Sequence, residues 1–161
     1  LRDIIHALKY GGRRSLAHPI AARMRAHGRE LLGAADCVVP VPLHWRREYQ
    51  RGFNQARELA HDLDRPVIDV LVRRRHTRAQ VELAADGRRT NVDSAFELRR
   101  PALRRRRSVE GSTVVLIDDV STTGATLEAC ARVLKEAGAR DVYALTAARV
   151  VARRGGVQSR G

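Results

Sequence analysis

Apolar residues along this chain occur in strand-length runs separated by segments with helical spacing. Four apolar runs predict strands: "CVVPVP" from Cys37, "PVIDVLVR" from Pro66, "VVLI" from Val114 and "DVYALTAARV" from Asp141. Helical periodicity extends over Ser15–Leu32, Phe53–Leu63 and Thr126–Ala137, and Gly138 follows as a C-terminal stop. Strands that alternate with helices predict an α/β fold, with a mostly parallel sheet flanked by helices on both faces.

One long segment breaks this alternation. His76–Ser94 contains few apolar residues and many charges, which predicts a long loop. Because loops of this length in a compact domain are commonly functional, we expect a mobile lid here. The glycine-rich, charged end from Arg153 onward predicts disorder. The expected organisation is therefore one domain over residues 1–152 and a disordered tail over 153–161.

Charge adds a second question to this picture. The 161 residues carry a formal net charge of +13, which favours nucleic-acid binding through phosphate neutralisation. However, Lys9 and Lys135 are the only lysines among the 31 basic residues, a bias that arginine-favouring, GC-rich coding also produces. The arginine runs at 73–75 and 104–107 lie in predicted loops, where a solvated surface explains them as well. Any DNA binding is expected to be weak, nonspecific and sensitive to salt.

Cysteine and histidine spacing indicates neither a metal knuckle nor a disulfide framework. Cys37 and Cys130 stand far apart and neither belongs to a C-x-x-C pair, which indicates a reducing compartment. The six histidines are scattered without metal-ligand spacing. No apolar run approaches the roughly 20 residues of a membrane helix, and no signal peptide is recognisable. We therefore expect a cytoplasmic protein that makes no membrane contact.

The stretch "VVLIDDVSTTGAT", residues 114–126, carries the clearest chemistry. A buried strand is followed by two carboxylates, Asp118 and Asp119, and the chain then turns through 122–125 into a helix. Amides at a helix start, together with threonine hydroxyls, suit a phosphate. The carboxylates would repel a bare phosphate, but vicinal sugar hydroxyls or a hydrated Mg²⁺ would satisfy them. The stretch therefore predicts a site for a phosphorylated ribose.

The same stretch resembles the phosphoribosyl diphosphate (PRPP) signature of type I phosphoribosyltransferases, in which two acidic residues precede a T-T-G-x-T phosphate loop. With "VPVPLHWRREYQRGFNQARELA" at 39–60 and the spacing of residues from Thr77 to Phe96, the chain is similar to the ComF family of competence-associated phosphoribosyltransferase-like proteins. The resemblance covers about residues 1–150 and implies a type I phosphoribosyltransferase-like fold. It departs from the family in lacking the cysteine-rich N-terminal zinc segment, and in having Ala84 where serine is frequent.

The resemblance also implies roles for particular residues. Asp118 and Asp119 would hold the ribose hydroxyls and Mg²⁺, while Arg51 and Gly52 would form the pyrophosphate loop. From the expected lid, Gln80, Arg88 and Asn91 would reach the pyrophosphate end, and Arg88 is assigned as catalytic beside the two aspartates. The loop for the 5-phosphate would consist of Ser121, Thr122, Thr123, Gly124, Ala125 and Thr126.

The reaction implied by the resemblance is displacement at the anomeric carbon of PRPP by a nitrogenous acceptor, a base or an amine, with release of pyrophosphate. Mg²⁺ is the implied cofactor. The acceptor stays unidentified, because neither Trp45 nor Ala147–Arg149 forms a recognisable base-reading pattern. Two other classes stay open: a non-catalytic protein that binds ribose phosphate, and a DNA-uptake accessory protein. A homo-oligomer is also compatible with the sequence.

Overall fold

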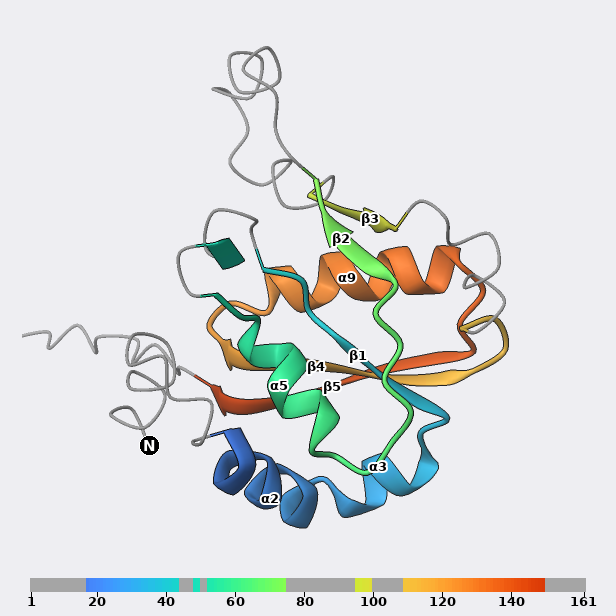
Figure 1. Cartoon of the computed structure of the whole chain (residues 1–161). Helices are drawn as coiled ribbons and strands as arrows, with labels where there is room; N and C mark the ends of the chain where they lie inside the picture. The colour runs from blue at the N-terminus through green and yellow to red at the C-terminus, as the bar shows by residue number, and fades with distance from the viewer. Residues whose placement is uncertain (1–16, 44–47, 50–51, 75–94, 100–108, 150–161) are drawn as a thin grey trace, which may run out of the picture.

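A parallel sheet forms the centre of the molecule (Figure 1). The computed structural model describes residues 17–43, 48–49, 52–74, 95–99 and 109–149. Strands β1 (Cys37–Pro40), β4 (Thr113–Ser121) and β5 (Asp141–Arg149) lie in the order β1-β4-β5, and both pairings are parallel. On the other side of β1, Val67 forms an isolated parallel bridge with Val38. The predicted α/β class and its parallel sheet are therefore confirmed.

The central strand β4 is buried on both faces. Because neighbouring side chains of a strand point to opposite faces, Val114 and Leu116 pack into one hydrophobic cluster, while Val115 and Ile117 pack into the other. All four side chains are at most 1% exposed. A strand covered on both faces has a continuous apolar sequence rather than an alternating one. This double burial explains why the run at 114–117 predicts the strand so clearly.

Helices cover the two faces of the sheet. One face carries α2 (Ala17–His27), α3 (Arg29–Ala34) and α5 (Gln55–His61). The opposite face carries α9 (Ala125–Glu136) and a short antiparallel pair, β2 (Leu71–Arg73) and β3 (Phe96–Leu98). Figure 1 shows α9 with β2 and β3 towards the top and α2 with α3 at the bottom. Among the described helices, none is long and apolar enough to cross a membrane.

Two predicted elements differ in the structure. The helix expected over Ser15–Leu32 is two helices, because the chain turns at Gly28 between α2 and α3. The strand expected from Pro66 is also interrupted: Val67 bridges β1, and the chain then departs to form β2. The break coincides with Asp69, whose carboxylate pairs with the guanidinium of Arg57 on α5. The ion-paired Asp69 therefore lies between the Val67 bridge and β2, which the sequence pattern predicts as one continuous strand.

The strand pair β2–β3 is a further difference, because the segment at 96–98 is not predicted as a strand. The arginine run at 73–75, expected in a loop, begins within this pair. Arg73 lies with its guanidinium carbon 5.4 Å from the centre of the Phe96 ring, and Arg74 Nε donates to Glu97 Oε2 at 2.7 Å. These arginines therefore hold the two short strands together as well as contributing surface charge.

Gly28 allows α2 and α3 to approach β5 closely. A Cβ placed on Gly28 would lie 2.9 Å from both Met24 O and Leu145 Cδ2. Met24 O already accepts a hydrogen bond from Gly28 N at 2.7 Å, so this backbone atom cannot easily move away. We predict that Gly28→Ala lowers the free energy of unfolding by about 1–3 kcal/mol, measured by urea denaturation.

Gly33→Ala is the matched control for this substitution. Gly33 lies within α3, and a Cβ placed there would meet no atom within 4 Å. Because alanine favours the helix over glycine, this variant should be about 0.5–1 kcal/mol more stable than the parent. Equal stabilities for the two variants would contradict the close approach at Gly28.

Candidate functional site

The candidate site lies where the strands end and two helices begin. In Figure 1 the carboxyl ends of β1, β4 and β5 lie at the left of the sheet, and α5 and α9 start at this same edge. Val41 N donates to Ile117 O at 2.9 Å, which joins the end of β1 directly to β4 just before its acidic pair. Ligands of open parallel sheets bind at this edge, so the topology places the predicted phosphate loop where such a site is expected.

The two carboxylates lie inside β4 rather than after it. The strand continues through Ser121, past the apolar run, and both Asp118 and Asp119 are half-buried. Strand alternation places Asp118 on the face covered by α9 and Asp119 on the face covered by α5. Asp119 N donates to Asp118 Oδ1 at 2.9 Å, and Val120 N donates to Asp119 Oδ1 at 2.7 Å. The backbone of the strand therefore orients each carboxylate.

Asp118 lies close enough to Cys130 of α9 to affect its ionisation. Burial, and to a lesser extent the Asp118 carboxylate, raise the pKa of the Cys130 thiol to about 12, and Arg73 of β2 opposes the increase. The thiol is fully buried and stays protonated at neutral pH. Cys130 is therefore a packing residue near Asp118, and burial is the main cause of its raised pKa.

The segment after β4 forms an open turn into α9. Thr122 and Thr123 are exposed, and Gly124 adopts a left-handed conformation with φ +85°. As the N-cap residue, Gly124 has no side chain to cap the helix; the Thr123 hydroxyl accepts from Ala125 N at a long 3.4 Å. The first amides of a helix have no partners within it, and a positive partial charge gathers there. The turn can therefore receive an anion, as predicted for the phosphate loop.

A second helix start is fixed beside this turn by Asn54, which the sequence analysis did not assign a role. Asn54 is 6% exposed; its Nδ2 donates to Val41 O at 3.1 Å, and its Oδ1 accepts from Ala56 N at 3.0 Å. One side chain thus caps α5 and attaches it to the end of β1. An asparagine immediately before a helical pattern is an N-cap signal that could have identified it.

The predicted site residues are only partly within the described structure. Gly52 lies just before α5 in a left-handed conformation with φ +73°, which agrees with the predicted turn at a helix start. Arg51 lies outside the described residues, as do Gln80, Arg88 and Asn91 together with the whole expected lid, His76–Ser94. The acidic pair, the phosphate loop and Gly52 therefore define the candidate site.

The oxygen donors of this site fit a magnesium ion shared with a ligand. Mg²⁺ is usually bound through one or two carboxylates, water and substrate phosphates. Asp118 and Asp119 supply two carboxylates beside a turn suited to phosphate. In the part of the chain that the structure describes, no group of three or more histidine, cysteine, aspartate or glutamate residues could hold a metal ion. The described residues thus fit shared coordination better than a closed protein cage.

The double role of Asn54 predicts graded effects of substitution. Asn54→Ala removes the cap of α5 and leaves Val41 O without its side-chain donor, so the free energy of unfolding should fall by about 1–3 kcal/mol. Asn54→Ser retains a side-chain oxygen that can cap the helix and loses only the donor to Val41 O, so its loss should be smaller. Urea denaturation measures both, and equal stability of all three proteins would contradict the assignment.

The pKa of Cys130 predicts a loss of stability at high pH. The folded thiol holds its proton to about pH 12, whereas a thiol at the ordinary value of 9.0 loses it earlier. The unfolded state therefore releases a proton first, and this thiol should reduce stability by about 1.4 kcal/mol per pH unit as pH rises from 9 towards 12. Cys130→Ala should show a correspondingly shallower dependence on alkaline pH. Parallel curves for variant and parent would contradict the prediction.

Known proteins share both the sequence and the fold of this chain. Residues 49–158 match the family model described as "Phosphoribosyl transferase domain". The chain is 34% identical over 152 residues to DNA utilization protein YhgH of Escherichia coli strain K12, covering 88% of this chain and 64% of that protein. It is 40% identical over 101 residues to competence protein ComFC of Bacillus subtilis strain 168, covering 63% of this chain and 39% of that protein. The chain spans less than two thirds of these relatives.

A solved structure supports the fold assignment. The structure described as "Structure of the allosteric regulatory enzyme of purine biosynthesis" matches with a TM-score of 0.50 at 20% identity, covering 82% of this chain and 26% of that one. This likeness concerns the fold alone and agrees with the expected type I phosphoribosyltransferase-like architecture. With the family model matching over most of the chain and relatives named for competence, the chain belongs to the phosphoribosyl transferase domain family and, within it, to the ComF group.

Proposed function

We propose that this domain binds PRPP and transfers its phosphoribosyl group to a nitrogenous acceptor. The observation that carries the proposal is the junction of β4 and α9, where two backbone-oriented carboxylates are followed by an open, glycine-capped helix start. A ribose 5-phosphate offers a phosphate for the helix start and vicinal hydroxyls for the carboxylates. No other described part of the chain combines these two kinds of group on one strand-to-helix turn.

The 5-phosphate would lie in the turn from Ser121 to Thr126. Three features support this placement: the first amides of α9 point out of the helix, the threonine hydroxyls of the turn are additional donors, and Gly124 lets the backbone approach the ligand closely. Asp118 and Asp119 would then accept hydrogen bonds from the ribose hydroxyls. Their placement on opposite faces of β4 suits two acceptors reaching the sugar from different sides.

The pyrophosphate end would lie towards the start of α5. Gly52 and the α5 N-terminus, fixed by Asn54, are next to the end of β1, so they flank the carboxylates from the side opposite α9. Arg51, next to Gly52 in the sequence, would add a guanidinium for the diphosphate. When bound, Mg²⁺ would stabilise negative charge on the leaving pyrophosphate, with Asp118 and Asp119 as its protein ligands.

In this reaction the protein positions the sugar, its phosphate and the acceptor, and it forms no covalent bond with the substrate. The bond between the anomeric carbon and pyrophosphate breaks, a nitrogen atom of the acceptor bonds to that carbon, and the nitrogen then loses its proton. The transition state has oxocarbenium character, as in other glycosyl transfers. The carboxylates hold the sugar, and the amides hold its phosphate. Cys130 takes no part, because its thiol is buried and protonated.

A second candidate function is a protein of DNA handling that binds PRPP without turnover. The observation that favours it is the naming of relatives as a DNA utilization protein and as competence proteins. The same ribose-phosphate site serves both functions, since a donor site shows binding and not turnover. Release of pyrophosphate on addition of an acceptor separates the two.

Thr123→Glu tests the shared site. A carboxylate in the exposed turn would occupy the phosphate position and repel the ligand, so calorimetry with PRPP and Mg²⁺ should show an affinity at least about tenfold weaker than that of the parent. Ala144→Glu adds the same charge at an exposed position of β5 and should bind like the parent.

The same samples can be mixed with a panel of bases and amines while pyrophosphate is measured. We expect release from the parent protein and the control, and none from Thr123→Glu. Unchanged PRPP affinity in Thr123→Glu would overturn the site. Tight binding without pyrophosphate release from any acceptor would instead favour the non-catalytic function.

A further inference from the structure

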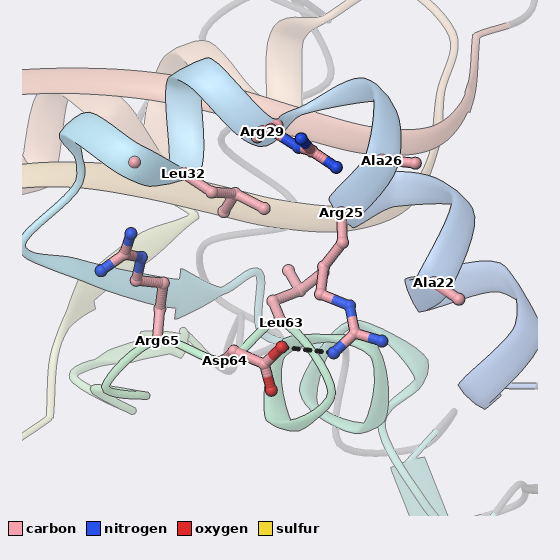
Figure 2. A pocket seen from close by; sticks show the side chains of 9 residues that line it. Ala22, Arg25, Ala26, Arg29, Leu32, Leu63, Asp64 and Arg65 are labelled. Carbon is pink, nitrogen blue, oxygen red and sulfur yellow. Dashed lines mark hydrogen bonds and ion pairs between the residues drawn. The ribbon is translucent and has the colours of Figure 1, made fainter.

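A charged cavity lies away from the ribose-phosphate site (Figure 2). It is formed between the α2–α3 elbow, which is the turn at Gly28 with the helices on either side, and the segment Leu63–Arg65 that follows α5. Its volume is about 380 Å³. The α3 helix leads into the amino end of β1, and the Leu63–Arg65 turn leads into the bridge beside it, so the cavity lies towards the opposite end of the sheet from Asp118. It is lined by Ala22, Arg25, Ala26, Arg29, Leu32, Gly33, Leu63, Asp64 and Arg65.

The lining carries an excess of positive charge. The lining includes three guanidinium groups, those of Arg25, Arg29 and Arg65, and one carboxylate, that of Asp64, which leaves two positive charges uncompensated within the lining. Asp64 forms an ion pair with Arg25, as the dashed line in Figure 2 shows. The Asp64 side chain is 75% exposed, so water screens this pair and its contribution to stability is small. Arg25 can therefore accept another anion at little cost.

Several arginines elsewhere in the described structure are neutralised by acidic side chains. Four of them pair with carboxylates: Arg57 and Arg99 with Asp69, Arg74 with Glu97, and Arg140 with Asp36. Among the described residues, Arg29 and Arg65 make no ion pair and no side-chain hydrogen bond. The cavity thus brings together two described guanidiniums without an ion pair, those of Arg29 and Arg65, and that of Arg25, which pairs with Asp64.

The floor of the cavity leaves space for a compact ligand. Leu32 and Leu63 are buried beneath it, and Ala22, Ala26 and Gly33 have side chains too small to fill it. No residue of the lining is aromatic, so the cavity has no ring on which a base could stack. Several forked guanidinium donors match the tetrahedral set of oxygen atoms of a phosphate group better than the two oxygen atoms of a planar carboxylate.

We propose that this cavity binds a phosphate monoester or phosphodiester group through Arg25, Arg29 and Arg65. The phosphate can come from a free mononucleotide or sugar phosphate, or from the backbone of a nucleic-acid strand, because both present the same oxygen atoms to the guanidiniums. The site is independent of the proposed transferase function, since none of its residues belongs to the strand-to-helix turn after β4.

The test uses the full chain with Thr123→Glu, so that a phosphate cannot bind at the α9 turn. Inorganic phosphate is titrated while backbone amide resonances are followed by NMR. We expect saturable shifts at Ala26 and Gly33. Adding Arg29→Gln and Arg65→Gln should weaken the apparent affinity at least about tenfold, because hydrogen bonds to charged groups are the strong ones. Arg23→Gln is the matched control for each of the two substitutions made singly: it also removes one positive charge, from an exposed position of α2 outside the lining, and should change affinity little.

Asp64→Asn provides a second variant with the opposite expectation. Asp64 has a positive φ of 53°, a conformation that asparagine also tolerates, so the turn should be preserved. Removing the competing carboxylate should strengthen phosphate binding about two- to fivefold, an effect that a merely structural role would not produce.

Adenosine monophosphate and a short single-stranded oligonucleotide, titrated in the same way, identify the source of the phosphate. Shifts at Ala26 and Gly33 with the mononucleotide support a small-molecule site. Shifts with the oligonucleotide alone support contact with a strand. Absence of saturable shifts with all three probes would overturn the proposal. The proposal would also be overturned if Arg23→Gln weakened phosphate binding as much as Arg29→Gln or Arg65→Gln alone, because net charge would then be responsible.

Discussion

Burial of β4 on both faces is the constraint on which the rest of the site depends. Up to Ile117 each side chain of the strand contacts one of two hydrophobic clusters, and a carboxylate there would be buried at a large cost. The first position at which ionised groups can occur is the edge where the helices no longer cover both faces. Asp118 and Asp119 occupy that edge, and the backbone of the strand orients them. The end of the buried part of β4 is therefore also the place where the candidate ligand-binding carboxylates begin.

Hydrogen bonds through Val41 extend this constraint to the other side of the site. Val41 N is bonded to Ile117 O of β4, and Val41 O is bonded to Asn54 Nδ2 at the start of α5. The two helix starts, at Gln55 and Ala125, are consequently held by neighbouring strands of one parallel sheet. A rigid sheet edge positions groups more accurately than independent loops do. Small changes at Asn54 should thus be felt at the acidic pair without any direct contact with a ligand.

Local patterns predicted the parts of this protein whose structure is local. The apolar run at 114–117, the acidic pair and the T-T-G-x-T turn lie within 13 residues, so strand, turn and helix could be inferred together. The close approach at Gly28 could not, because it involves Leu145, far along the chain. The β2–β3 pair also depends on a nonlocal pairing, and Asp69, where the predicted strand is interrupted, forms an ion pair with Arg57. The second role of Asn54 needs a contact with Val41, which only the fold brings about.

The two ends of the sheet offer an anion different physical environments. At the carboxyl edge, the donors are backbone amides and hydroxyls beside carboxylates, an arrangement that selects a ligand bearing both phosphate and hydroxyl groups. In the cavity beside the turn between α2 and α3, the donors are side-chain guanidiniums above an apolar floor, an arrangement that recognises charge more than shape. Interactions of the second kind weaken more strongly with salt when they are exposed. The net charge of +13 does not by itself decide where anions bind. Carboxylates neutralise several arginines of the described structure, whereas Arg29 and Arg65 at the cavity have no such partner among the described residues.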